Sequence, residues 1–233
     1  MKDYKQEGSK GCEHCIWNNS CIGSKLLEYA PYIKIFQSHM LSVNEHVFNT
    51  GDILSTLYVV KSGAIKIYVT NDSGDEQVLN FSLPNDVIGL DGYDSDQYVS
   101  SAIALHTSSV CAIPLAEVKK ILNEVVPEWL LKLALDNFKR HGRNISLLNK
   151  KKAKSRIAAF LIDTADNCKS LGCSGKDFEL SMSRDDIGNY LGLASETVSR
   201  TLSQLQQEGW VKMERRQVTI VDIPHLSEAA QHR

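Results

Sequence analysis

The pattern of hydrophobic residues changes once along this 233-residue chain, and that change limits the folds that the chain can adopt. From about Leu26 to Pro114, short apolar runs recur at roughly ten-residue intervals, separated by turns that carry glycine. This spacing predicts a small β-barrel or double-sheet roll. After Pro127 the apolar residues follow a helical period instead. The sequence therefore predicts an α+β protein with its strands first and its helices second.

The first helical segment carries a narrow apolar stripe. No proline interrupts residues 128–162, so one long helix is expected there. Such a stripe is hard to bury inside a small monomer, which favours a dimer seam; the alternative is that the stripe packs on the chain's own strands. Gly142 would let two helices approach closely, at a cost of about 1 kcal/mol in helix propensity. The expected seam residues are Leu131, Leu135, Phe138, Gly142, Ile145 and Leu148.

Two short helices joined by a glycine turn are expected near the carboxy terminus. Ser183 is the expected N-cap of the first helix, and Asp186 stands three residues later, as in a capping box. Gly192 supplies the turn, and a second helix is expected over about 195–207. This is the pattern of a helix-turn-helix, whose second helix enters the major groove of double-stranded DNA.

One face of the second helix is polar and suited to base edges. Arg200 is able to make a bidentate contact to guanine, and Glu196 is able to accept from the cytosine amino group. The chain then forms an expected β-hairpin wing over 210–220 with a basic tip at 214–216. Residues 139–216 carry fifteen Lys or Arg against nine Asp or Glu, a net charge of +6 that suits a polyanion. The expected DNA-binding residues are Glu196, Thr197, Ser199, Arg200 and Ser203.

Four of the six cysteines form a candidate metal site. Cys12, Cys15 and Cys21 lie close together near the start of the chain, and Cys111 ends a strand-like run far from them. Four thiolates suit an iron–sulfur cluster or a tetrahedral Zn²⁺ ion, and the residues alone leave both open. The remaining pair, Cys168 and Cys173, is expected to be free thiols in a surface connection.

Several protein classes are excluded by what the sequence does not contain. The first residues are polar and no apolar run approaches the roughly 18 residues of a membrane span, so a cytoplasmic protein without membrane contact is expected. No phosphate-binding glycine loop or nucleophile triad stands out, so an enzyme is not expected. A cluster-bearing electron-transfer protein is an alternative of a different class, although the sequence shows no acceptor surface or second cofactor site for it.

Roll, long helix and winged helix-turn-helix together resemble the CRP/FNR family of bacterial transcription regulators over essentially the whole chain. The three amino-terminal cysteines at spacings x2 and x5, the fourth within 110–114, and the segments 62–66, 74–77 and 196–200 resemble the oxygen-sensing FNR branch. The resemblance implies a cysteine-rich cluster-binding loop over 1–25, a cyclic-nucleotide-binding-like β-roll over 26–126, a dimerisation helix over 127–153 and a winged helix-turn-helix DNA-binding domain over 154–233.

The resemblance also implies a mechanism. A [4Fe-4S] cluster on Cys12, Cys15, Cys21 and Cys111 would hold a homodimer on palindromic DNA with TTGAT-type half-sites and regulate anaerobic genes. Zn²⁺, and sensing of NO or thiol oxidation, remain alternatives. By the same resemblance, segments 74–77 and 83–86 are candidates for touching RNA polymerase. The family's repelling carboxylate at the dimer-helix crossing is not matched, because this chain has a cationic stretch over 139–143.

No cyclic nucleotide is expected in the roll. Cyclic-nucleotide members of the family carry a Glu for the ribose and an Arg for the phosphate after the roll's glycine-rich turn. Here the stretch 88–105 contains three aspartates and no Lys, Arg or Glu. A phosphate would meet repulsion and would find no bidentate partner.

Overall fold

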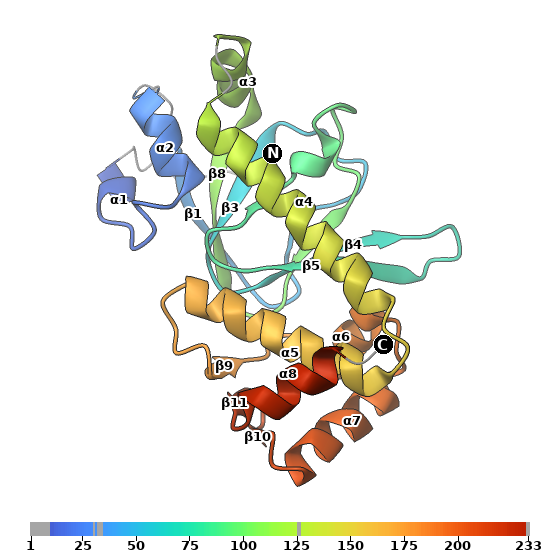
Figure 1. Cartoon of the computed structure of the whole chain (residues 1–233). Coiled ribbons are helices and arrows are strands. Elements are labelled where there is room, and N and C mark those ends of the chain that lie inside the picture. The colour runs from blue at the N-terminus through green and yellow to red at the C-terminus, as the bar shows by residue number, and fades with distance from the viewer. Residues whose placement is uncertain (1–9, 30, 32–34, 125–126, 232–233) are drawn as a thin grey trace. The chain divides into compact units, whose positions relative to one another are not determined.

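The computed structural model describes residues 10–29, 31, 35–124 and 127–231. The ends of the predicted first and last segments, and short stretches at 30, 32–34 and 125–126, lie outside the described residues. The chain divides into two compact units, Met1–Leu135 and Asp136–Arg233, with helix α4 (Glu128–Leu148) running from one into the other. Figure 1 labels the elements of both units.

The first unit is the predicted double-sheet roll. Its two antiparallel four-stranded sheets have the strand orders β1-β8-β3-β6 and β2-β7-β4-β5. The strands are β1 (Phe36–Leu41), β2 (His46–Phe48), β3 (Thr56–Ser62), β4 (Ile65–Thr70), β5 (Glu76–Ser82), β6 (Val87–Ile88), β7 (Ser101–Ala104) and β8 (Ser108–Pro114). The 3₁₀ turn η1 (Leu90–Gly92) and helix α3 (Leu115–Glu124) complete this part. The α+β class expected from the sequence is confirmed.

The turn between β3 and β4 requires a glycine at position 63. Gly63 has φ +88, and a Cβ there would lie 2.7 Å from the backbone Cα of Ser108 on β8. Only glycine fits a backbone this close at a left-handed φ. The turn lets β3 pass directly into β4, although the two strands belong to different sheets.

The segment over residues 1–25 is more ordered than the predicted loop. Its described part contains two short helices, α1 (Lys10–Glu13) and α2 (Ile22–Tyr29). Ile22 and Leu26 stand one turn apart on α2 and are both buried, in the same core as Ile35. That burial anchors α2 to the roll. The polar composition of the segment did not predict this contact.

The long helix is shorter than predicted. An uninterrupted helix over 127–153 was expected, but α4 ends at Leu148 and α5 begins at Ala153. Asn149 and three consecutive lysines, 150–152, fill the break. The Lys150 carbonyl, which a continuous helix would use internally, accepts a hydrogen bond from Arg156 Nε at 2.7 Å.

The second unit is the predicted winged helix-turn-helix. Its elements are α5 (Ala153–Ser170), β9 (Asp177–Glu179), α6 (Arg184–Leu191), α7 (Ser195–Gln207), β10 (Val211–Glu214), β11 (Gln217–Ile220) and α8 (Ile223–Gln231). The capping box is present: the Asp186 amide donates to Ser183 Oγ at 2.9 Å and the Ser183 amide donates to Asp186 Oδ2 at 3.2 Å. Gly192 turns the chain with φ 62.

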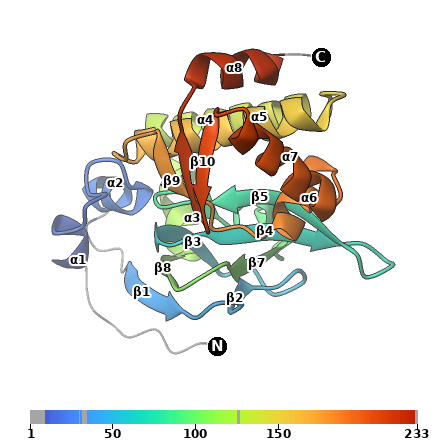
Figure 2. The same ribbon diagram turned by 90° about the horizontal axis from the view of Figure 1, so that it is seen from below.

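Two elements of this unit were not predicted. Strand β9 adds to the edge of the wing, giving a three-stranded sheet in the order β10-β11-β9. Helix α8 lies along α5 (Figure 2). Its residues Leu226, Ala229 and Ala230 are buried. Among the helices that the structure describes, none is both long and apolar enough to cross a membrane.

Candidate metal centre and nucleic-acid interface

Four thiols from remote parts of the chain line one pocket. Cys12 lies on α1, Cys15 and Cys21 lie between α1 and α2, and Cys111 lies on β8. The antiparallel register pairs Cys111 with Val59 on β3, and Val59 forms part of the same pocket wall. The structure thus brings together the four cysteines that the sequence singled out. Three come from a short segment and the fourth from a strand inside a sheet.

Local hydrogen bonds hold the three amino-terminal cysteines in place. The Cys15 amide donates to the Cys12 carbonyl at 3.1 Å, and the Cys21 amide donates to the Trp17 carbonyl at 2.8 Å. Trp17 Nε1 also donates to the carbonyl of Lys61, at the end of β3, at 3.0 Å. This side-chain bond ties the loop to the strand beside Cys111. Sequence reasoning did not identify Trp17.

The thiols influence one another electrostatically. Burial, followed by the charges of Cys21, Cys111 and Cys15, raises the pKa of Cys12 to about 11. Burial also raises the pKa of Cys21, although backbone amides of Gly23 and Ser24 oppose the shift. The Gly23 amide lies 3.3 Å from Cys21 Sγ. These shifts mean that the two thiols hold their protons at neutral pH, and a metal that binds them must displace the protons.

The donor set of the pocket suits zinc or an iron–sulfur cluster. Its cysteine ligands are all sulfur, the donors that select zinc or iron–sulfur clusters. Among the described residues, no three His, Cys, Asp or Glu side chains are grouped to hold a metal ion. Zn²⁺ would take all four thiolates on one ion, whereas a [4Fe-4S] cluster would take one thiolate on each iron.

Ser24 supplies a second indication of a bound group. This residue lines the cysteine pocket and is only 7% exposed, yet its Oγ has no hydrogen-bond partner among the residues that the structure describes. A buried hydroxyl without a partner costs about 1–3 kcal/mol, so such groups are rare in folded proteins. An acceptor bound in the pocket, such as a sulfide, would satisfy it.

Helix α7 presents the predicted polar face. Glu196, Ser199, Arg200 and Ser203 are exposed, and Thr197 is half-buried. The opposite face is core, with Val198, Leu202 and Leu205 at 0, 3 and 0% exposure. Ser203 Oγ donates to the carbonyl of Ser199 at 3.0 Å, so this hydroxyl is partly engaged within its own helix.

Two residues that sequence reasoning missed fix the angle between α6 and α7. Arg156 on α5 donates through Nη1 to the carbonyls of Leu191 and Gly192, at 2.9 and 3.2 Å. Gly188 on α6 faces the backbone after the turn, and a Cβ there would lie 2.5 Å from the Leu193 carbonyl oxygen. The helices approach so closely that position 188 must be glycine. Gly188 is four residues from the turn, so its role was not apparent.

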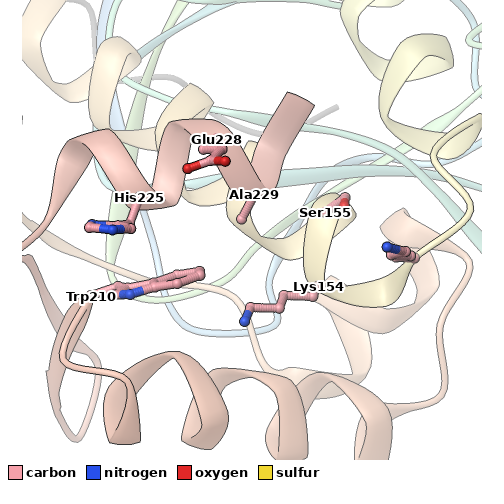
Figure 3. Close-up of a pocket in the computed structure, with 7 residues that line it drawn as sticks. Lys154, Ser155, Trp210, His225, Glu228 and Ala229 are labelled. Carbon is pink, nitrogen blue, oxygen red and sulfur yellow. The ribbon is translucent and has the colours of Figure 1, made fainter. Parts of the chain in front are cut away.

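The lysines at 150–152 and 154, around the start of α5, are only partly available to a polyanion. Lys154 Nζ lies 2.6 Å from Glu208 Oε2. It also lies 4.1 Å from the centre of the Trp210 ring, and Figure 3 shows these two side chains. The hydrogen bond from Lys154 holds the pKa of Glu208 below its usual range. Lys154 is therefore committed to joining α5 to the start of the wing. Lys151 and Lys152 are exposed.

Helix α4 exposes its apolar stripe. Leu131, Leu135, Phe138, Ile145 and Leu148 are 58, 49, 77, 61 and 38% exposed, and a Cβ at Gly142 would meet nothing within 4 Å. The exposed stripe is available to a partner helix, and the dimer seam stays a prediction. The cationic stretch beside it is partly neutralised, because Arg143 Nε lies 3.2 Å from Asp163 Oδ1 on α5.

In the stretch 88–105, which is expected to exclude cyclic nucleotides, two of the three aspartates are held by local polar contacts. Asp91 accepts a hydrogen bond from Ser100 Oγ, and Asp96 pairs with Lys119 on α3 at 2.9 Å. Gly92 is required at its position, since a Cβ there would lie 1.9 Å from the Gln97 carbonyl oxygen. The absence of cyclic-nucleotide binding stays a prediction.

Comparison with known proteins identifies the family. A family model described as "Crp-like helix-turn-helix domain" matches residues 155–229, and one described as "Cyclic nucleotide-binding domain" matches 39–125. The chain is 40% identical to the transcriptional activator protein anr of Pseudomonas aeruginosa, over 82% of this chain and 79% of that protein. It is 36% identical to the fumarate and nitrate reduction regulatory protein of Vibrio cholerae, over 94% and 90%.

Solved structures agree with this result. The structure of FixK2 from Bradyrhizobium japonicum matches with a TM-score of 0.74 and 28% identity, and the match covers 84% of this chain and 98% of that one. The helix-turn-helix model and both relatives indicate a DNA-binding transcription regulator rather than an enzyme. The chain belongs to the CRP/FNR family of transcription regulators.

Proposed function

We propose that this protein is an oxygen-responsive regulator of anaerobic genes, in which a [4Fe-4S] cluster on Cys12, Cys15, Cys21 and Cys111 controls a DNA-binding homodimer. The observation that carries the proposal is the convergence of these four thiols on one pocket. The relatives named anaerobic or fumarate and nitrate reduction regulators support it. Bound there, the cluster would supply a centre that molecular oxygen degrades.

The cysteines of the pocket and the start of the proposed dimer helix, α4, pack against the same core. Cys12, Cys21 and Cys111 pack against the buried core of the roll, and so do Trp129 and Leu133 from the first turns of α4. Loss of the cluster would release the amino-terminal segment from Cys111 and remove one side of that packing. We infer that the core then no longer fixes the start of α4, whose exposed stripe forms the dimer seam.

DNA recognition is assigned to α7. Arg200 and Glu196 would read base edges of a TTGAT-type half-site, and Thr197, Ser199 and Ser203 would add contacts beside them. The wing tip, with Arg216, would contact phosphate. Two copies related by a twofold axis would read the two halves of a palindrome.

Binding to a palindrome with two TTGAT-type half-sites tests this proposal. The protein, reconstituted with iron and sulfide without air, is expected to bind the palindrome as a dimer and to release it after exposure to oxygen. Equal affinity before and after oxygen would refute the sensor while leaving the DNA reader intact. Release by NO or thiol oxidants but not by oxygen would favour the alternative signal. Contact with RNA polymerase through 74–77 or 83–86 is a further part of the proposal.

Phe138 tests the dimer seam. Its side chain is 77% exposed, so Phe138→Glu should leave the fold of one chain intact and place a charge in the seam. Burial of a Phe contributes about 1.5–3 kcal/mol, so we expect dimer affinity to fall at least tenfold. Sedimentation of the cluster-loaded protein measures this. Lys132→Glu, at an exposed position on the same helix outside the predicted seam, is the control. An unchanged dimer constant for Phe138→Glu would place the seam elsewhere.

Ser24 tests whether a group fills the cysteine pocket. Ser24→Ala removes a buried hydroxyl that lacks a partner, so the metal-free protein should become more stable, by about 1 kcal/mol. The cluster-loaded protein should instead lose a hydrogen bond, and its reduction potential should become more negative. Denaturant unfolding and redox titration measure the two effects. Ser20→Ala, whose hydroxyl is exposed, is the matched control. Equal effects on both forms would mean that Ser24 does not contact the group.

A further inference from the structure

We propose that Cys168 and Cys173 form a redox-active dithiol in the DNA-binding unit, which a low-molecular-weight disulfide oxidises to an internal disulfide. The site is separate from the four-cysteine pocket and does not depend on the proposed cluster. The sequence suggested only two free thiols in a surface connection. The structure gives them a specific relationship at the end of α5.

The end of α5 is a Schellman motif, and this motif brings the two cysteines together. The Cys173 amide donates to the Cys168 carbonyl at 3.0 Å, and the Gly172 amide donates to the Lys169 carbonyl at 3.0 Å. Gly172 takes the left-handed φ of +84 that the motif requires. Side chains at the first and last positions of a Schellman motif normally meet in an apolar contact. Here both positions are cysteine.

The two thiols differ in solvent exposure, as the attacking and the resolving cysteine of a dithiol do. Cys173 is exposed, whereas Cys168 is half-buried. Burial and a hydrogen bond shared with Cys173 raise the pKa of Cys168 to about 11. The Cys168 thiol therefore keeps its proton beside the Cys173 sulfur. Cys173 is the thiol that an oxidant in solution would meet first, and Cys168 is its neighbour across the Schellman motif.

The chemistry is two successive thiol–disulfide exchanges. The Cys173 thiolate attacks one sulfur of a low-molecular-weight disulfide, which breaks that S–S bond, forms a mixed disulfide and releases one thiolate. Cys168 loses its proton to solvent and attacks the Cys173 sulfur, which releases the second thiolate. The protein loses two electrons, the small disulfide gains them, and the two protons end on the two released thiols.

Trypsin provides a direct test, because Lys169 lies between the two cysteines. Cleavage after Arg156, Lys169 and Lys176 puts Cys168 in the peptide 157–169 and Cys173 in the peptide 170–176. The folded full-length protein is treated with glutathione disulfide, free thiols are blocked, and the digest is analysed by mass spectrometry. We expect the two peptides joined, two hydrogens lighter than their sum, and separated again by dithiothreitol.

Two variants make the outcome decisive. Cys168→Ser should stop the reaction at the mixed disulfide, so the peptide 170–176 should carry glutathione. Cys173→Ser should give no joined peptide, and the peptide 157–169 should remain largely unmodified. If the unaltered protein keeps glutathione on Cys173, or if Cys173 joins a cysteine outside this pair, the proposal is wrong. The same digest separates the four amino-terminal and mid-chain cysteines into other peptides, so failure here leaves the cluster proposal unaffected.

Discussion

Cys111→Ser is expected to abolish both cluster binding and anaerobic DNA binding, while the roll remains folded. Cys111 is the one predicted ligand on a strand of the roll, and through it a cluster would link the other three ligands to that sheet. Serine is nearly the same size, and the site is half-buried, so the packing of β8 against β3 should survive. Loss of a cluster ligand removes the group rather than weakening it.

The measurements for Cys111→Ser are visible absorption, iron content and affinity for the palindrome, all without air. Cys168→Ser is the matched control, because it removes a half-buried cysteine of the other unit. It should retain the cluster and the DNA affinity. Full anaerobic binding by the Cys111→Ser protein, together with a circular-dichroism spectrum unchanged from the parent, would show that the mid-chain thiol has no part in the response.

Arg200→Ala is expected to remove sequence discrimination at one base pair of each half-site. Arg200 is exposed on α7, on the face opposite buried Val198, Leu202 and Leu205. A bidentate contact from Arg to guanine contributes about 1–3 kcal/mol of discrimination against the wrong base, or roughly a 5- to 150-fold preference. The variant should bind the parent site and a site changed at that base pair with nearly equal affinity.

Arg216→Ala is the control for Arg200→Ala. Arg216 lies in the turn between β10 and β11 and is exposed, so it suits phosphate rather than a base. Its removal should weaken binding to all sequences alike and reduce the salt dependence by about one unit of slope. Competition binding on both sites at several salt concentrations separates the two effects. If Arg200→Ala weakens both sites equally, Arg200 contacts the backbone and α7 reads bases through other residues.

The parts of the fold with local signals could be predicted closely. The second helix of the helix-turn-helix was expected over about 195–207 and is observed at Ser195–Gln207. The capping box at Ser183, the turn glycine at 192 and the apolar spacing on α7 each act over only a few residues. The alternation of the roll strands gave the sheet class in the same way.

Features that depend on tertiary contacts could not be predicted. The break between α4 and α5 contains no proline or glycine and is set by Arg156, whose partners lie up to 36 residues away. Helix α8 and strand β9 are short and gain their order from burial against α5 and β11. The pairing of Val59 with Cys111 fixes which face of β8 meets the amino-terminal loop, and no local pattern specifies it.

The metal content of the protein, isolated from cells and handled without air, tests the central claim most directly. Iron, acid-labile sulfide and zinc are measured on the same sample as its visible spectrum. A cluster on the four thiols predicts a brown protein with about four irons and four sulfides per chain, lost together on exposure to oxygen. A colourless protein with one zinc per chain and full affinity for the palindrome would contradict it.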